Sequence, residues 1–285
     1  AVALPQEARR RRQELHRRLM SLAFDRVGDG TPAFVFVHGF GCAREDWAAQ
    51  TAHFKWAHTC LSLDLPGFGG SPTLPNEPSM QAFGFAIART LANEDIGRSV
   101  LCGHSMGCRP IIEYAIARPE CVNGLVLVDP GRASTDYEPS KRQFVALIAE
   151  RGFPNHARAM FANMFFDPTY NELRDRLAER GAAVPPDVAT STYLAMLDWD
   201  ANRCEAAFDA VAVPVLVIQS TTRNPGEDRR PLKPGEMSPY QKMIVERIDG
   251  AETESFPGVG HFTMIEAAGD VNARIARFVE ERVTP

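Results

Sequence analysis

A serine between two glycines is the feature of this chain with the clearest chemical use. The segment Gly103-His-Ser-Met-Gly107 has the pattern Gly-x-Ser-x-Gly, and it lies between an apolar run at 98–102 and a helix-like segment at 108–118. A sharp turn between a strand and a helix would hold Ser105 in a strained conformation with its hydroxyl exposed. The two glycines would let the strand and the helix approach closely. We therefore predict that Ser105 is a nucleophile.

A serine hydroxyl is a poor nucleophile unless a base takes its proton and a carboxylate orients that base. His261 is the candidate base, because it lies late in the chain, directly after the last predicted strand. Asp129 directly follows four apolar residues, so it is expected at the carboxyl edge of a parallel sheet, where such sheets bind their ligands. Asp228 lies beside Glu227 in a long polar loop. We favour Asp129 as the acid, with Asp228 as the alternative.

The elements that must position these residues follow from the hydrophobic pattern. Short apolar segments alternate with segments of helical periodicity, which predicts an α/β fold with a mostly parallel sheet covered on both faces. A Gly-Asp-Gly turn predicts that the first two strands form an antiparallel hairpin. The predicted strands are residues 22–26, 33–37, 59–64, 98–102, 125–129, 213–219 and 253–256, and a helix over 272–281 closes the chain.

The middle of the chain has a different pattern. Residues 131–210 lack a clear strand and contain several amphipathic helical segments rich in large apolar side chains. We interpret this stretch as a helical cap inserted between two strands of a core domain, which comprises residues 21–130 and 211–285. Residues 1–20 are rich in arginine and are predicted to form a basic N-terminal helix.

Composition narrows the possible partners. The chain has 285 residues, of which 45% are hydrophobic and 24% charged, and its net charge of -5 argues against a nucleic-acid partner. No apolar run approaches the roughly 20 residues that span a membrane. The six cysteines lack metal-site spacing, so we expect free thiols in a reducing compartment and a cytoplasmic protein. We expect neither a metal nor an organic cofactor, and the oligomeric state is not indicated.

Several motifs in this order resemble the α/β-hydrolase superfamily, from Leu22 to the C-terminus. The resemblance implies the α/β-hydrolase fold with an inserted helical cap, and a triad of serine, histidine and acid. The motifs are His38-Gly-Phe40, Asp64-Leu-Pro-Gly-Phe-Gly-Gly-Ser71, the turn at Ser105, Leu125-Val-Leu-Val-Asp-Pro130, Pro214-Val-Leu-Val-Ile218 and Gly258-Val-Gly-His-Phe262.

The resemblance also implies an oxyanion hole, in which the backbone N–H groups of Phe40 and Met106 stabilise a negatively charged oxygen. The chain departs from the family at the acid, because Arg223 and Asn224 stand where most members have an aspartate. Asp129 corresponds to the other position known in the superfamily. The residues expected to shape or line the substrate pocket are His38, Gly39, His104, Phe161, Phe165, Trp199 and Phe262, with His38 shaping the oxyanion loop.

These expectations favour a serine hydrolase that cleaves a carboxylic ester or lactone of an apolar small molecule through an acyl-enzyme intermediate. Three other activities use the same fold and residue types. They are hydrolysis of a carbon–carbon bond in a vinylogous diketone, cofactor-free dioxygenation, and ligand binding by a receptor with a vestigial triad. The large apolar side chains of the predicted cap indicate an apolar pocket.

Overall fold

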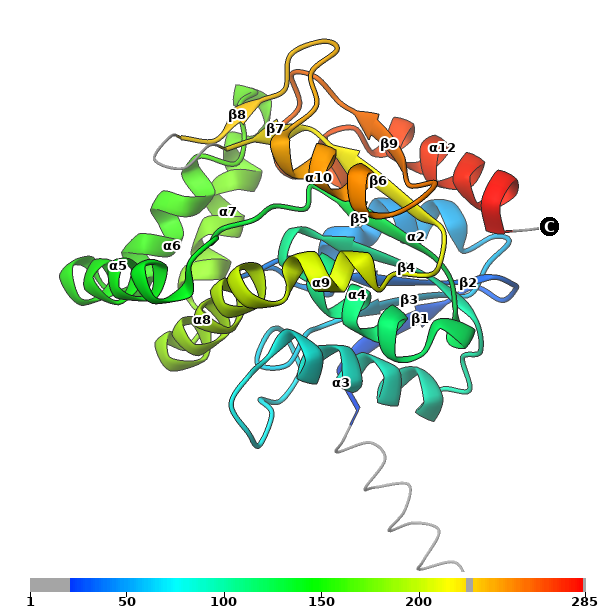
Figure 1. Cartoon of the computed structure of the whole chain (residues 1–285), viewed down its shortest axis with the longest axis horizontal. Helices are drawn as coiled ribbons and strands as arrows, with labels where there is room; N and C mark the ends of the chain where they lie inside the picture. Colours follow the sequence, from blue (N-terminus) through cyan, green and yellow to red (C-terminus); the bar gives the residue numbers. More distant parts are fainter. Residues whose placement is uncertain (1–20, 224–227, 284–285) are drawn as a thin grey trace, which may run out of the picture.

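The computed structural model describes residues 21–223 and 228–283 (Figure 1). The predicted basic helix over residues 1–20 lies outside these residues, as does Glu227. No helix in the described part of the chain is long and apolar enough to cross a bilayer.

Seven strands form one mostly parallel sheet, as predicted, in the order β1-β3-β2-β4-β5-β6-β9. β1 is antiparallel to its neighbour, and the other neighbours run parallel. Strands β2, β4 and β6 are buried along their whole length, as parallel strands covered on both faces must be. In spatial order the strands are Phe24–Val27, Cys60–Leu63, Ala33–Val37, Ser99–His104, Val122–Val128, Val215–Gln219 and Glu252–Ser255.

The predicted hairpin between the first two strands is wrong. β1 pairs with β3, through contacts such as Phe24 opposite Leu63, and β3 lies between β1 and β2. The turn itself is present, but it packs against the segment that leads into β3. A Cβ atom on Gly30 would lie 2.2 Å from the Ala57 carbonyl oxygen, and the Gly30 oxygen accepts a hydrogen bond from Thr59 N at 3.0 Å. These contacts align β1 with β3.

Helices cover both faces of the sheet. Successive side chains of β2 alternate between two hydrophobic cores: Val35 and Val37 enter one, and Phe34 and Phe36 enter the other. The first core is covered by α3 (Met80–Asn93), α4 (Cys108–Ala117) and α10 (Pro239–Arg247), and the second by α2 (Ala48–Phe54) and α12 (Ala268–Phe278). The short elements are η1 (Arg44–Trp47), η2 (Ser105–Gly107), η3 (Pro119–Cys121), α11 (Thr263–Glu266), η5 (Val279–Val283) and the pair β7 (Thr221–Thr222) and β8 (Arg230–Pro231).

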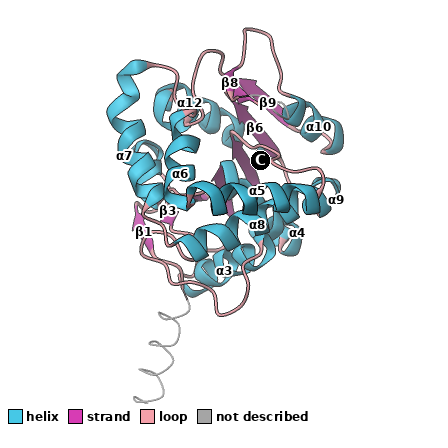
Figure 2. Cartoon of the chain, turned by 90° about the vertical axis from the view of Figure 1, so that its left-hand side faces the viewer, coloured by secondary structure: helices cyan, strands magenta, loops and turns pink. Residues whose placement is uncertain are grey.

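A helical insertion, α5 to α9, separates β5 from β6. Figure 1 shows α5 to α8 gathered at the left, and Figure 2, viewed from that side, shows them in front of the strands. Its elements are α5 (Tyr137–Arg151), α6 (Phe153–Ala162), η4 (Pro168–Tyr170), α7 (Asn171–Ala182), α8 (Pro186–Asn202) and α9 (Cys204–Asp209).

A buried ion pair ties this insertion to the core. Arg109 of α4 donates from Nε and Nη2 to the two carboxylate oxygens of Asp200 on α8, both at 2.8 Å. Both side chains are buried, at 4% and 0% exposure. Close by, the Trp199 indole donates to Glu113 of α4 at 2.7 Å. Removing one partner of such a pair leaves a buried charge without compensation.

We therefore expect Asp200→Ala to lower the free energy of unfolding by about 3–5 kcal/mol, measured by urea denaturation. Glu179→Ala is the matched control, because Glu179 forms an exposed pair with Arg158, and exposed pairs contribute little. Equal, small losses in the two variants would contradict a structural role for the buried pair.

Candidate active site

Ser105 lies on a sharp turn between β4 and α4, with a left-handed φ of 51° that is costly for a residue other than glycine. The two flanking glycines make the turn possible. A Cβ atom on Gly103 would lie 2.6 Å from the Gly107 oxygen, and one on Gly107 would lie 2.5 Å from the oxygen of His38. The strand and the helix thus approach so closely that a larger side chain has no room.

The fold brings His261 to this turn from 156 residues away. His261 Nε2 lies 3.0 Å from Ser105 Oγ. The histidine is buried and follows β9, and its backbone is held on both sides: its N–H donates to the Met164 carbonyl at 2.7 Å, and its carbonyl lies 2.8 Å from His104 Nε2. The serine and the histidine therefore meet in a geometry that permits proton transfer between them.

Glu266, which sequence reasoning missed, holds the loop that carries His261. Its carboxylate accepts hydrogen bonds from Gly260 N at 3.2 Å and Phe262 N at 3.3 Å, one on each side of the histidine. Burial raises the pKa of Glu266 to about 7. The one available sequence signal is an acidic residue five positions after His261.

Asp129 lies where the sequence predicted, directly after β5, and it is fully buried with a left-handed φ of 46°. Its carboxylate accepts from Ser220 N at 2.8 Å, from Ser220 Oγ at 2.7 Å and from the Thr263 hydroxyl. Its oxygen lies within 4.8 Å of a His261 ring nitrogen, but no hydrogen bond joins the two side chains. Asp228 is exposed, and within the described residues it makes no hydrogen bond to His261.

An arginine faces the ring nitrogen that the acid was expected to face. Arg229 Nη1 lies 3.0 Å from His261 Nδ1 and donates to Thr221 Oγ1 at 2.8 Å. Thr221 Oγ1 itself is 3.4 Å from Nδ1. Because a guanidinium can only donate, Nδ1 accepts in this arrangement and the imidazole proton lies on Nε2. Sequence reasoning did not select Arg229.

Burial and positive charge set the protonation of this site. Burial lowers the pKa of His261 well below its ordinary value, and the neighbouring Arg229 and His104 lower it further. Burial also raises the pKa of Asp129 to about 6, although hydrogen bonds from Thr263 and Ser220 oppose this shift. His261 is therefore held neutral.

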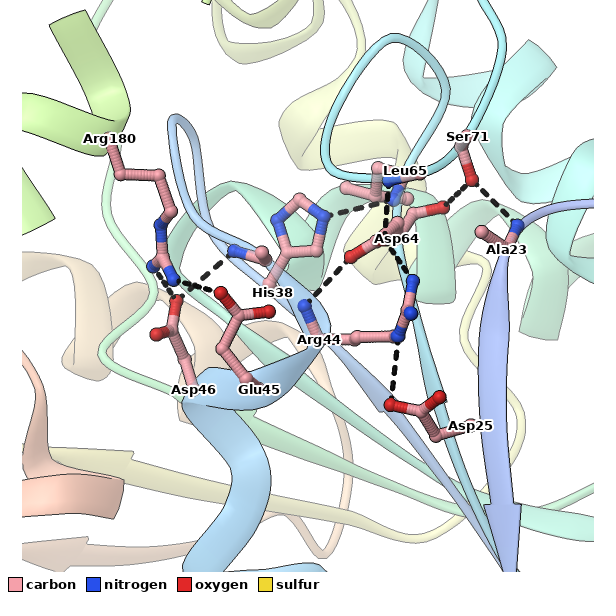
Figure 3. Close-up of polar contacts among 12 residues, drawn as sticks. Ala23, Asp25, His38, Arg44, Glu45, Asp46, Asp64, Leu65, Ser71 and Arg180 are labelled. Carbon is pink, nitrogen blue, oxygen red and sulfur yellow. Dashed lines mark hydrogen bonds and ion pairs between the residues drawn. The ribbon is translucent and has the colours of Figure 1, made fainter. Parts of the chain in front are cut away.

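The predicted oxyanion loop follows β2 and lies against the serine. A Cβ atom on Gly39 would lie 2.9 Å from His104 Nδ1 and 3.3 Å from Ser105 Cβ. His38 is buried and fixes the start of the loop, because its Nδ1 is 2.7 Å from the Gly39 oxygen and its Nε2 accepts from Leu65 N at 2.9 Å (Figure 3). The backbone of residues 39 and 40 is thus held close to the serine.

Ion pairs hold η1, the short helix that follows this loop, from two directions (Figure 3). Asp64, after β3, accepts from Arg44 N at 2.9 Å and from Arg44 Nη1 at 2.5 Å. Arg180 of α7 pairs with Glu45 at 2.7 Å and with Asp46. The segment directly after the loop is therefore connected both to the sheet and to the helical insertion.

The aromatic residues predicted for the pocket divide into two groups. Phe262 stacks with Phe165 at a ring-centroid distance of 4.9 Å and with Phe161 at 6.2 Å. Trp199 lies elsewhere, buried against α4, where it bonds to Glu113. The Phe40 ring contacts Tyr193 of α8 at 5.4 Å.

His104, Asp129 and His261 form the one group of described residues with enough nearby donor atoms for a metal ion. Their donor atoms already contact protein groups: His104 Nε2 the His261 carbonyl, Asp129 the Ser220 and Thr263 hydroxyls, and His261 the Ser105 hydroxyl. We assign no metal to them. All six cysteines are free thiols.

Comparisons with known proteins agree with this fold. Residues 34–274 match the model described as "Alpha/beta hydrolase family". Among curated proteins, the chain is similar to the dihydrolipoyllysine-residue acetyltransferase component of the acetoin cleaving system of Pseudomonas putida, with 24% identity over 262 residues. The match covers 90% of this chain and 66% of that protein, so the chain spans less than two thirds of the relative's length.

Two solved structures share the fold. An esterase from Thermogutta terrifontis, with malate bound, has a TM-score of 0.76 at 22% identity, over 92% of this chain and 94% of that one. The enol-lactonase from Burkholderia xenovorans LB400 has a TM-score of 0.75 at 17% identity, over 91% and 96%. The predicted fold class is confirmed.

The charge next to His261 predicts how the ring titrates. We expect His261 to stay neutral well below pH 6.5, with its proton on Nε2, as measured by NMR of the ¹⁵N-labelled imidazole. Arg229→Gln should raise the pKa of His261, because it removes a positive neighbour that disfavours the imidazolium. Arg158→Gln, which removes a surface arginine, is the control. A pKa at or above 6.5, or one that Arg229→Gln leaves in place, would contradict this electrostatic description.

Proposed function

The chain belongs to the alpha/beta hydrolase family, and on that premise we propose that it is a serine hydrolase that cleaves a carboxylic ester or lactone. The observation that carries the proposal is the strained Ser105, whose Oγ lies 3.0 Å from His261 Nε2. A hydroxyl held out on a turn beside a neutral imidazole is the arrangement that nucleophilic catalysis needs. The esterase and the enol-lactonase of the same fold support this reaction class.

The reaction proceeds through an acyl-enzyme. His261 Nε2 takes the proton of Ser105 as Oγ attacks the substrate carbonyl, and the N–H groups of Phe40 and Met106 stabilise the oxyanion. The histidine then gives its proton to the leaving alkoxide. Water attacks the acyl-serine with His261 again as base, which releases the acid and restores Ser105.

This sequence of steps requires a change at His261. To accept a proton at Nε2, the ring must carry its other proton on Nδ1, so Arg229 has to turn away from that atom. Thr221 Oγ1 is an acceptor on the same side, at 3.4 Å. The buried Asp129 carboxylate is close enough to stabilise the imidazolium that forms. We assign Asp129 as the acid, because the exposed Asp228 has no comparable position.

The expectation of an apolar substrate has mixed support. The aromatic side chains around Phe40 and Phe262 suit an apolar part of the substrate. The charged guanidinium of Arg229 beside His261 does not suit an apolar group. No contact among the described residues favours carbon–carbon bond hydrolysis, dioxygenation or slow receptor-type turnover.

Ser105→Ala tests the nucleophile. We expect it to abolish hydrolysis of 4-nitrophenyl esters while preserving the fold, because a small side chain on a turn is shortened. A fluorophosphonate should label the wild-type protein at Ser105, located by peptide mass spectrometry. Labelling at another residue, or full activity in Ser105→Ala, would rule out the proposed function.

Asp129→Asn tests the acid. We expect kcat to fall roughly 10³–10⁴-fold, because the amide no longer favours the imidazolium or the required tautomer. Asp228→Asn is the matched control and should leave kcat within a factor of two. Circular dichroism checks that both variants fold. If Asp228→Asn shows the large loss and Asp129→Asn does not, the assignment is reversed.

A further inference from the structure

Arg229 uses only part of its hydrogen-bonding capacity on the residues that the structure describes. Nη1 serves Thr221 and His261. The other edge of the guanidinium, formed by Nε and Nη2, donates to no acceptor in the described part of the chain. Neither of these nitrogens is sealed from solvent, although the side chain as a whole is half-buried. As far as the described residues go, two parallel N–H donors therefore remain open beside His261.

Among the residues that the structure describes, the positive charge of Arg229 also lacks a direct counterion. No carboxylate lies within 4.0 Å of it among the described residues, whereas Arg109 pairs with Asp200 and Arg180 with Asp46. The negative charge of Asp129 acts on Arg229, but its carboxylate oxygens accept hydrogen bonds from Ser220 and Thr263 instead. A partly buried guanidinium without a paired anion is costly.

The surroundings favour an anion at this position. Burial lowers the pKa of Arg229 to about 10, and the positive charge of Arg223 contributes. Both arginines also act on the hydroxyl of Tyr193, on the helical insertion. A carboxylate fits the open edge, because its two oxygens match two parallel N–H donors.

We propose that Arg229 binds a carboxylate group of the substrate, so that the site selects esters or lactones bearing a carboxylate a few bonds from the reacting carbonyl. The inference rests on the proposed function. One imidazole ring separates Arg229 from Ser105, a span that a short carbon chain crosses. The pairing also gives Arg229 an acceptor other than Nδ1, which frees His261 to adopt the tautomer that catalysis requires.

The binding test needs no turnover. Isothermal titration of Ser105→Ala with monomethyl adipate should show an affinity at least tenfold higher than for the double variant Ser105→Ala, Arg229→Gln, because a bidentate charged contact is lost. Methyl hexanoate, which carries a methyl in place of the carboxylate, should bind both alike. A difference of less than threefold for monomethyl adipate overturns the proposal, and a larger difference supports it.

The kinetic test compares mono-4-nitrophenyl adipate with 4-nitrophenyl hexanoate. The ratio of their kcat/KM values should fall at least tenfold in Arg229→Gln and stay unchanged in Arg158→Gln. If kcat/KM falls by the same factor for both substrates, Arg229 acts on His261 alone and the proposal is wrong. If Arg229→Gln does not fold, Arg229→Lys replaces it, because lysine keeps the charge but not the paired donors. The ratio of the two kcat/KM values should then fall at least threefold.

Failure of the proposed function is distinguishable from failure of this inference. Carboxylate binding that depends on Arg229, without ester hydrolysis, would keep the carboxylate site and reject the hydrolase. Ester hydrolysis with no dependence on Arg229 in either test would keep the hydrolase and reject the carboxylate site.

Discussion

The close approach of β4 and α4 at Ser105 is the constraint on which the rest of the site depends. It holds the serine at a left-handed φ and leaves room only for glycine at positions 103 and 107. The strain is sustained by the structure around it. Arg109, the second residue of α4, donates to the Ser105 carbonyl at 3.3 Å while it pairs with Asp200. Ser105, its helix and the helical insertion are thereby fixed to one another.

The histidine is positioned by a different means. Its loop comes from the far end of the chain and is held by Glu266 on both sides and by the Met164 carbonyl. Asp129 contributes to this positioning through Thr263, which follows the histidine by two residues. The result is a buried imidazole whose backbone is held on both sides and whose Nδ1 faces the guanidinium of Arg229. These surroundings hold His261 neutral, and the proposed role as base requires a change of its hydrogen-bond partner at Nδ1.

Local patterns explain how much of this could be predicted from the sequence. The turn at Ser105 was predictable because its glycines and flanking elements are adjacent in the chain, and Asp129 because a strand end fixes its place in a parallel sheet. The hairpin prediction failed because the partner of an edge strand depends on which strand packs next to β2. Arg229 and Glu266 were missed because their contacts with the histidine loop exist only once the loops have folded back, and no local pattern records them.

We expect Ser105 to carry the acyl group during turnover. The most direct test is to quench the protein with acid while it turns over a slowly deacylating ester, and to measure the mass of its peptides. We expect a peptide containing Ser105 that is heavier by the acyl group, and no such peptide in Ser105→Ala. Steady turnover with no acyl group on Ser105, under conditions where release of the acid is rate-limiting, would contradict it.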